Sequence, residues 1–206
     1  MKELSIVIQQ VKDLQKAGLK FVLATVVRVE GSAYRRPGAR MLIAEDGNWW
    51  GGISGGCLEG DILKKAQLAL FSQSYKTITY DTREDDPFQL GIGLGCQGLI
   101  EIIIDPIRAH LVDVANQLQA CLESGRTHVM QSTWDDDFFE MKEVADQAGS
   151  FVQTDAKQVF IERIPANTRI WIVGNQFDAN SLIQLCHQLA WEIHWVGNTL
   201  KMKSEI

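Results

Sequence analysis

A glycine-dense loop that carries a cysteine and leads into a helix is the strongest constraint in this sequence. It reads Gly-Gly-Ile-Ser-Gly-Gly-Cys-Leu-Glu-Gly-Asp over residues 51–61. Glycine lets backbone N–H groups approach a ligand closely and adopt positive φ. The start of a helix adds unpaired N–H donors and a partial positive charge. This environment favours a phosphate or oxyanion, and it stabilises the thiolate form of a cysteine placed in it.

A second glycine-rich stretch carries another cysteine. It reads Gly-Ile-Gly-Leu-Gly-Cys-Gln-Gly over residues 91–98 and places Cys96 directly after Gly95. Two such loops in one small domain indicate a binding site rather than two tight turns. The alternative for the first loop is a plain strand–helix turn around a small cysteine, and the alternative for Cys96 is a buried free thiol.

Composition and charge exclude several classes of partner. The net charge of −6 argues against nucleic acid or an anionic membrane as the main partner. No apolar run approaches the ~20 residues that a membrane-spanning helix needs. The four cysteines have no CxxC spacing. This pattern indicates free thiols in a reducing cytoplasm and argues against a structural zinc site.

Alternating helical and extended patterns predict an α/β fold. Apolar residues at helical spacing predict helices over 3–17, 58–69 and 111–122. Runs rich in β-branched residues predict strands over 21–29, 40–44, 75–80, 99–104, 127–133, 150–154 and 158–164. We expect a mixed sheet with the helices outside and the glycine loops at one edge.

A second, smaller unit is expected after a linker at residues 165–168. A strand–helix–strand pattern over 169–206 predicts one βαβ unit, which is the start of a doubly wound sheet. Gln176 stands where close approach of a pyrophosphate requires glycine, and the second strand ends without an acidic residue for a ribose hydroxyl. We therefore do not expect NAD to bind here.

The same unit predicts self-association. A single βαβ unit leaves a sheet edge and an apolar helix face uncovered. Exposed edges of this kind tend to be paired or covered. Trp171, Trp191 and Trp195 fall within it. A homodimer is the commonest solution, and the alternative is that the unit packs on residues 1–164.

Three motifs in a fixed order resemble the XdhC/CoxI family. They are Gly-Ser-Ala-Tyr-Arg-Arg-Pro-Gly-Ala-Arg-Met at 31–41, Gly-Ile-Ser-Gly-Gly-Cys-Leu-Glu at 52–59 and Gly-Leu-Gly-Cys-Gln-Gly at 93–98. The resemblance is dense over residues 1–110 and sparse beyond them. It implies an XdhC-like cofactor-binding domain over 1–164, followed by a truncated Rossmann-like unit over 169–206. Members of the family are accessory proteins of molybdenum hydroxylases such as xanthine dehydrogenase.

The resemblance implies a cytoplasmic, non-enzymatic chaperone. Such a protein binds the molybdenum cofactor (molybdopterin), protects it and delivers it to an apo molybdenum hydroxylase of the xanthine dehydrogenase type. The arginines would contact the phosphate or the pterin edge, and the Cys57 thiolate is a soft ligand for molybdenum or its sulfur. The residues expected to bind the cofactor are Arg35, Arg36, Arg40, Ser54, Gly55, Gly56, Cys57, Glu59, Gly95 and Cys96.

Other interpretations stay open. Cys57 is also a candidate nucleophile of a sulfur-transfer or thiol-redox enzyme, with a cysteine desulfurase as a further partner. A docking protein that binds no ligand is the third class. The arginines could instead form a solvated loop paired with the acidic residues 81–87, and the helix dipole alone accounts for Glu59. Trp49 and Trp50 fit core packing or stacking on a flat pterin.

Overall fold

Helices and strands both build the fold, so the predicted α/β class is confirmed. The computed structural model describes residues 2–81, 83, 98–106, 108–135, 138–154, 156–174 and 176–197. The helices are α1 (Lys2–Ala17), α2 (Glu59–Ser72), α3 (Arg108–Glu123) and α4 (Phe177–Gln188). The strands are β1 (Phe21–Gly31), β2 (Arg40–Ala44), β3 (Trp49–Gly51), β4 (Lys76–Asp81), β5 (Gly98–Asp105), β6 (His128–Trp134), β7 (Phe139–Glu143), β8 (Ser150–Gln153), β9 (Gln158–Ile164), β10 (Arg169–Val173) and β11 (Glu192–Val196).

A five-stranded sheet with the order β3-β2-β1-β5-β4 forms the centre of the fold. Each of its pairings is antiparallel, not mixed as the sequence led us to expect. The reason is that β1, β2 and β3 follow one another as hairpins, and short turns join antiparallel neighbours. One of these turns contains Gly47, which adopts a φ of 87°.

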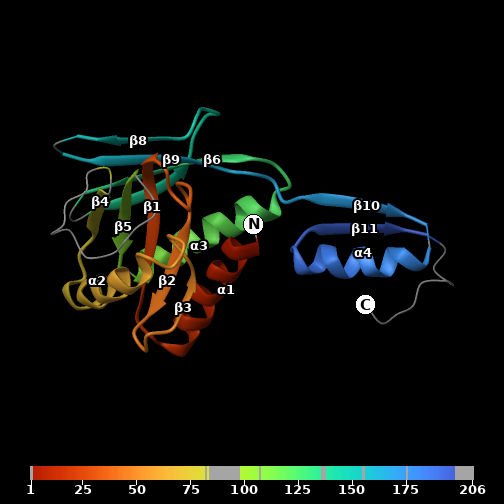
Figure 1. Cartoon of the computed structure of the whole chain (residues 1–206), viewed down its shortest axis with the longest axis horizontal. Coiled ribbons are helices and arrows are strands. Elements are labelled where there is room, and N and C mark those ends of the chain that lie inside the picture. The colour runs from red at the N-terminus through yellow and green to blue at the C-terminus, as the bar shows by residue number, and fades with distance from the viewer. Residues whose placement is uncertain are drawn as a thin grey trace.

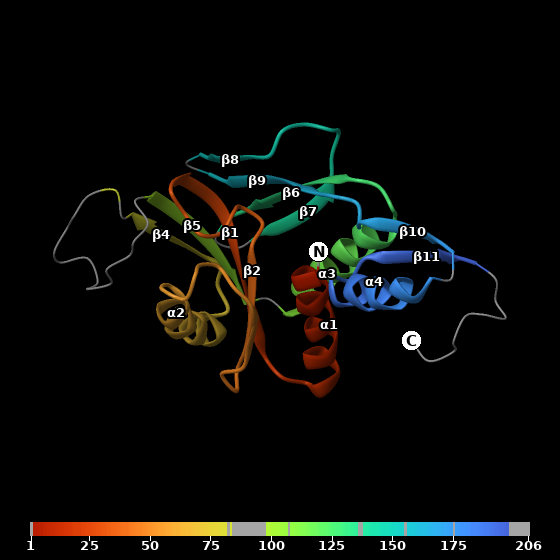
Figure 2. The same cartoon turned by 45° about the vertical axis from the view of Figure 1, so that its right-hand side comes forward.

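Helices cover both faces of this sheet, as Figure 2 shows with α2 on one side and α1 and α3 on the other. Successive β1 side chains point to opposite faces, so Val22 and Ala24 pack under α2 while Phe21 and Leu23 pack under α1 and α3. The α2 layer also buries Ile53, which anchors the glycine loop. The apolar spacing in α1 and α2 therefore identifies the buried face of each helix correctly.

A second sheet, with the order β7-β6-β9-β8, packs against the first. It lies across one end of the five-stranded sheet in both views (Figures 1 and 2). Val27 and Ile103 from the first sheet meet Trp134 and Phe160 from the second in a shared core. β7 and β3 escaped prediction because β7 buries one side chain, Met141, and β3 contains three residues.

The predicted βαβ unit is present at one end of the molecule, with β4 and α2 at the other (Figure 1). β10 and β11 pair in parallel, and α4 packs on them through its own small core of Ile172, Ala179 and Ile183. The boundary between residues 1–164 and 169–206 as independent domains stays a prediction. None of the described helices has the length and apolar character needed to cross a bilayer.

A buried ion pair joins the two sheets. Arg40 begins β2 and Glu162 lies in β9, and their side chains are 6% and 7% exposed. Arg40 Nη1 donates to Glu162 Oε2 at 3.2 Å and to the Gly38 carbonyl at 2.9 Å, while Nη2 donates to Glu162 Oε1. Removing one partner of such a pair leaves an uncompensated charge in the interior.

We expect Glu162→Ala to lower the free energy of unfolding by about 3–5 kcal/mol, because it strands the Arg40 guanidinium. Urea unfolding followed by circular dichroism measures the loss. Asp146→Ala is the control, since it breaks the exposed pair with Arg163 (48% and 74% exposed), and it should cost less than about 1 kcal/mol. Equal losses for the two variants would contradict a structural role for the buried pair.

Candidate functional site

The glycine loop joins β3 to α2 at the edge of the five-stranded sheet, as predicted. Its first residue, Gly51, has a φ of 79°, and a Cβ there would lie 2.3 Å from the Arg40 carbonyl oxygen. No other residue fits this position. Leu58 is the N-cap of α2, and the exposed Cys57 directly precedes it.

The carboxylate of Glu59 already occupies part of the expected anion cradle. Glu59 Oε1 accepts from the N–H of Ser54 at 2.8 Å and of Ile53 at 3.3 Å, and the Ser54 hydroxyl donates to Oε2. Ser54 Oγ in turn accepts from the N–H of Gly56 at 3.2 Å and of Leu58 at 3.1 Å. Several N–H groups that we expected to hold a phosphate are therefore bonded within the loop.

These hydrogen bonds set the protonation of Glu59. Burial on its own would raise the pKa of this carboxyl group, but the donors from Ser54 and Ile53 outweigh it and leave the pKa below its usual value. Glu59 is therefore ionised at neutral pH. Its hydrogen bonds to Ser54 and Ile53 stabilise the loop in addition to the interaction with the helix dipole that its position in the sequence suggests.

The exposed tip of the loop keeps free groups. Within the described part of the chain, the N–H groups of Gly55 and Cys57 have no acceptor. The ring of Tyr34, which is 74% exposed, lies against Gly55, where a Cβ would be 3.1 Å from the ring. A ligand at this tip would meet two N–H donors, a thiol and the flat face of a ring.

The three arginines of the first motif have different surroundings. Arg35 pairs with Glu3 in the first turn of α1, and Glu3 Oε1 also accepts from the N–H of Gly52 at 3.1 Å. Arg36 is exposed, and no carboxylate of the described residues pairs with it. Arg40 is buried with its ion-pair partner in β9, so it is not part of an exposed electropositive rim. Its role in binding the cofactor stays a prediction.

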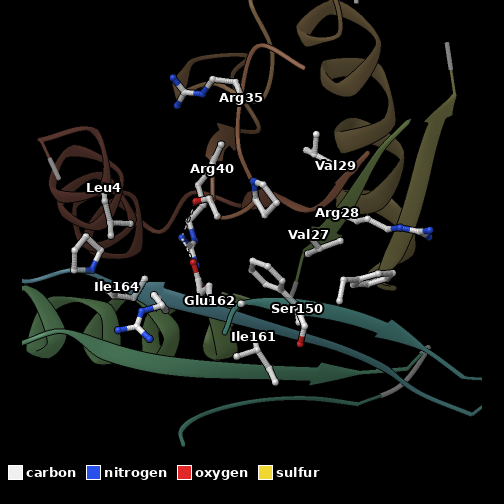
Figure 3. Close-up of a pocket in the computed structure, with 18 of the residues that line it drawn as sticks. Leu4, Val27, Arg28, Val29, Arg35, Arg40, Ser150, Ile161, Glu162 and Ile164 are labelled. Carbon is white, nitrogen blue, oxygen red and sulfur yellow. Dashed lines mark hydrogen bonds and ion pairs between the residues drawn. The ribbon is translucent and has the colours of Figure 1, made fainter. Parts of the chain in front are cut away.

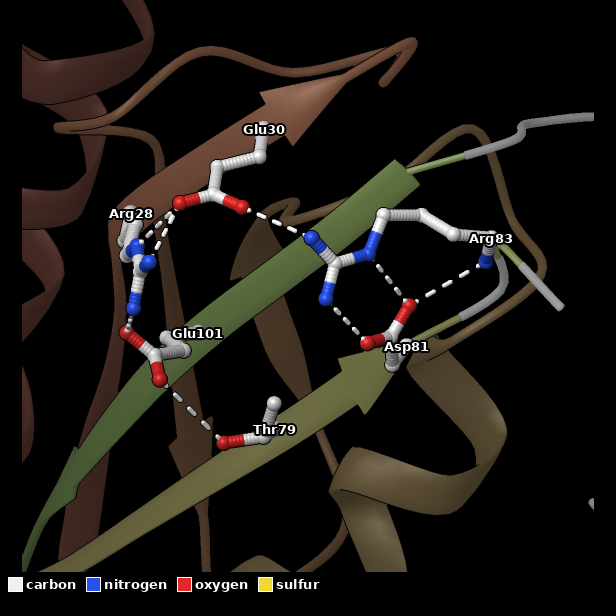
Figure 4. Close-up of polar contacts among 6 residues, drawn as sticks. All are labelled: Arg28, Glu30, Thr79, Asp81, Arg83 and Glu101. Carbon is white, nitrogen blue, oxygen red and sulfur yellow. Dashed lines mark hydrogen bonds and ion pairs between the residues drawn. The ribbon is translucent and has the colours of Figure 1, made fainter.

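The alternative pairing of these arginines with the acidic residues 81–87 stays open, because the structure describes residues 81 and 83 alone of this segment. Asp81 binds Arg83 at 2.5 and 2.9 Å, and Arg83 Nη1 reaches Glu30 at 2.9 Å (Figure 4). Arg28 then links Glu30 to the buried Glu101 across β1 and β5. This network pairs the acidic side chains on the described strand ends with Arg28 and Arg83.

A hollow of about 500 Å³ lies beside the glycine loop. Its walls include the Arg35–Glu3 pair and the half-exposed ring of Trp49, whereas Trp50 packs against the core under α1. The structure thus separates the two tryptophans, and Trp49 is the one that faces a candidate site. The residues that line this hollow include Glu3, Arg35, Trp49, Gly52, Ser54 and Glu59.

The second glycine loop is described at its last residue alone. Gly95 and Cys96, and the acidic Asp85 and Asp86, lie outside the described residues. Gly98 begins β5, and a Cβ there would lie 2.6 Å from the Glu30 carbonyl and 2.7 Å from that of Ser32. The end of this loop therefore adjoins the start of the first motif.

The remaining candidates fall into the core or into the βαβ unit. The thiols of Cys121 on α3 and Cys186 on α4 are buried. The described residues contain no group of three or more His, Cys, Asp or Glu that could hold a metal ion, so Cys57 would be a lone thiolate ligand among them. Gln176 is the N-cap of α4, and the absence of NAD binding there stays a prediction.

Sequence reasoning missed Glu3 and Glu162. Glu3 gave no signal, because an acidic residue in a first helical turn is explained by the dipole alone. Glu162 does carry one, since it alternates with Phe160 and Ile164 on the buried face of β9. A charged residue at an apolar position of a strand requires a buried partner.

Comparison with known proteins agrees with the resemblance. Residues 14–81 match the XdhC and CoxI family. A relative from Bacillus subtilis, described as a probable xanthine dehydrogenase component, is 42% identical over 106 residues, which cover 51% of this chain and 32% of that protein. The molybdenum cofactor insertion chaperone PaoD of Escherichia coli is 34% identical over 105 residues, covering 50% of this chain and 32% of that protein.

The fold is also similar to a solved structure. A crystal structure described as a xanthine dehydrogenase from Bacillus halodurans matches with a TM-score of 0.68 and 26% identity, covering 96% of this chain and 64% of that one. This chain thus spans about a third of the length of the curated relatives (32%).

We expect the Glu59 carboxylate to stabilise the fold above pH ~4.3, the usual glutamate value, and this contribution to disappear as the pH falls further. The sign follows from the lowered pKa, because the unfolded chain binds the proton more tightly than the folded one. Unfolding measured between pH 7 and pH 3 should show a shallower decline for Glu59→Gln than for the wild type. Parallel declines would show that the loop bonds do not favour the ionised form.

Proposed function

Because residues 14–81 belong to the XdhC and CoxI family, we propose that the protein binds the molybdenum cofactor in the cytoplasm, protects it and delivers it to an apo molybdenum hydroxylase of the xanthine dehydrogenase type. The observation that carries the proposal is the tip of the glycine loop. There, an exposed thiol stands beside two N–H donors without acceptors among the described residues. The similarity to the Escherichia coli insertion chaperone supports the same role.

The groups at this tip fit the anionic end of such a ligand. The cofactor supplies a molybdenum centre held by a dithiolene and a terminal phosphate. Cys57 would provide a soft thiolate, and the N–H groups of Gly55 and Cys57 would donate to an oxygen. Arg36 would add a mobile positive charge. Gly95 and Cys96 remain proposed contacts from the second loop.

A catalytic role for Cys57 has less support. A thiol nucleophile needs a base within hydrogen-bonding reach, and none of the described residues hydrogen-bonds to the Cys57 thiol. A cysteine desulfurase as an additional partner remains compatible with the chaperone proposal, because an exposed thiol can receive sulfur. A docking protein that binds no ligand is the remaining alternative, and it would co-purify with neither pterin nor molybdenum.

We also propose that the chain forms a homodimer through its βαβ unit. Trp171, Val173 and Phe177 in this unit are 62%, 81% and 93% exposed. Exposed apolar side chains gathered in one small element are typical of an interface. Light scattering at several concentrations would show a dimer mass, and a monomer mass throughout would refute the dimer.

We expect Cys57→Ala to reduce the molybdenum and pterin that co-purify anaerobically with the protein at least tenfold, while the circular dichroism spectrum stays unchanged. The thiol is exposed, so its loss removes a ligand contact without creating a cavity. Metal analysis and pterin fluorescence of the purified protein measure retention. Retention equal to that of the wild type would sink the anchoring role.

Two variants complete this experiment. Cys186→Ala removes a thiol that is buried in α4, so retention should match the wild type. Arg36→Gln should lower retention several-fold and make it less sensitive to salt, because screening acts on an exposed charge. If Cys186→Ala reduced retention as strongly as Cys57→Ala, the effect would be one of stability and not of binding.

A further inference from the structure

Strand β4 forms one edge of the five-stranded sheet and pairs with β5 alone among the described strands. It is six residues long, whereas β3 at the opposite edge has three. Along an edge strand, alternate residues direct their backbone N–H and C=O groups away from the sheet. Within the described chain, no backbone group forms a hydrogen bond to β4 across this outer edge. An open edge of this kind is a template for pairing with a further strand.

A groove of about 600 Å³ lies at this strand, and we call it the β4 groove. The consecutive residues 75–79 contribute to its lining. Its other walls come from two separate layers, since Lys65 and Leu68 belong to α2, while Trp134 and Gln158 belong to β6 and β9. None of these residues lines the hollow beside the glycine loop, so the β4 groove is a separate feature of the surface.

The two walls of the β4 groove lie on opposite faces of the five-stranded sheet. Ile102 of β5 packs under α2, and the next residue, Ile103, packs against Trp134 of the second sheet. Figure 2 shows the same arrangement, with α2 and the second sheet on either side of β4 and β5. A groove that is lined from both faces passes across the edge of the sheet, so its floor includes the open edge of β4.

Hydrogen bonds hold β4 in place against the second sheet. Thr77 Oγ1 donates to Gln158 Oε1 at 2.7 Å, and Trp134 Nε1 donates to Thr77 Oγ1 at 3.4 Å. The side-chain NH2 group of Gln158 has no acceptor in the part of the chain that the structure describes. This wall of the groove therefore offers neutral polar groups at a fixed position, which suit neutral polar side chains of an added strand.

The rim of the groove on the α2 side is apolar and exposed. Leu68 and Phe71 are 63% and 93% exposed, and they lie with Lys64 on one face of α2 at helical spacing. Exposed apolar side chains that adjoin a groove are typical of an interaction surface. Because successive side chains of a strand point to opposite faces, every second side chain of an added strand would face this rim.

The same rim is basic, although the chain as a whole has a net charge of −6. Lys64 and Lys76 are exposed, and neither forms an ion pair with a carboxylate of the described residues. The carboxylates in the lining have other positions, since Glu101 is ion-paired with Arg28 and Asp135 directly follows β6 in the second sheet. Charge complementarity therefore favours an added strand whose acidic side chains face α2.

A second copy of this chain fits the β4 groove less well than a different protein does. A two-fold axis that joined β4 to the β4 of another copy would keep both α2 helices on the same face of the extended sheet. The lysines of the two rims would then approach each other, and like charges across paired strands are destabilising. A strand that carries carboxylates avoids this repulsion.

We propose that the β4 groove binds an extended segment of a different protein, which pairs with β4 as an additional strand. The acidic and apolar side chains of this segment face Lys76 and Leu68, and they alternate with neutral polar side chains that face Trp134 and Gln158. The proposal goes beyond cofactor binding and does not depend on it. A lysine at position 76 that only keeps the edge from pairing is the competing account.

A fluorescein-labelled octapeptide with the sequence Thr-Val-Thr-Glu-Thr-Val-Thr-Glu tests the proposal by fluorescence anisotropy. Its Val and Glu residues alternate with Thr, so one face is apolar and acidic and the other is neutral and polar. We expect saturable binding to the full chain, and binding about tenfold weaker for the peptide with Lys in place of both Glu residues. No saturable binding of the acidic peptide, or equal affinity for the two peptides, would overturn the proposal.

Methylation of the peptide backbone distinguishes strand pairing from charge attraction. Methyl groups on alternate backbone nitrogens remove the N–H donors along one edge of the peptide and leave the other edge intact. Of two peptides that are methylated along opposite edges, only one should lose its binding to the wild type. Equal affinities for the two would show that the peptide does not pair with β4.

Substitutions on the rim test whether the peptide binds in the β4 groove. Leu68→Glu and Lys76→Glu change exposed side chains, so the circular dichroism spectrum should stay unchanged while the affinity for the acidic peptide falls about tenfold. Lys16→Glu makes the same charge change at an exposed position of α1 and should bind the peptide like the wild type. Equal losses in Lys16→Glu and Lys76→Glu would show an unspecific attraction and reject the groove.

Light scattering of Leu68→Glu tests for a second copy in the groove. We expect the same mass as for the wild type, and a lower mass would show that another copy occupies the groove, which would refute the proposal. Cys57→Ala should bind the acidic peptide like the wild type, because its thiol lies outside the lining. Peptide binding by a chain that retains no molybdenum would keep this docking site and reject the chaperone role.

Discussion

The ion pair between Arg40 and Glu162 is a buried polar contact that joins the two sheets beside their shared apolar core. It fastens the first residue of β2 to the middle of β9, and so it fixes one sheet relative to the other. The backbone of Arg40 continues the connection, since its carbonyl accepts the N–H of Gly52 at 2.9 Å. A single residue therefore links the packing of the two layers to the position at which the glycine loop begins.

The glycine loop is organised by its own side chains before any ligand is considered. Glu59 and Ser54 tie its inner part together, and the anchor residue Ile53 is fully buried beneath α2. Asp61 in the first turn of α2 binds Tyr80 of β4 at 2.5 Å and Lys65 at 2.6 Å, which holds the helix against the sheet. The tip at Cys57 therefore lies on a part of the loop that these contacts hold in place, as is common for functional loops on a stable scaffold.

Local patterns in the sequence predict the elements well and their long-range partners poorly. The helical spacing of Val7, Ile8 and Val11 identifies α1, and the glycine run followed by Ile62 and Ala66 identifies the start of α2. Nothing near Arg40 shows that its partner is 122 residues away, so it resembled the other arginines of its motif. Likewise, glycine at position 51 suggested room for a ligand, whereas the structure requires it for contact with a neighbouring carbonyl.

The shared wall formed by Glu3 and Arg35 has a thermodynamic consequence. Both residues line the hollow at the glycine loop and a second hollow, of about 640 Å³, between the two sheets (Figure 3). A ligand that displaced this pair from one hollow would change the wall of the other, and linkage would require the effect on affinity to be equal in both directions.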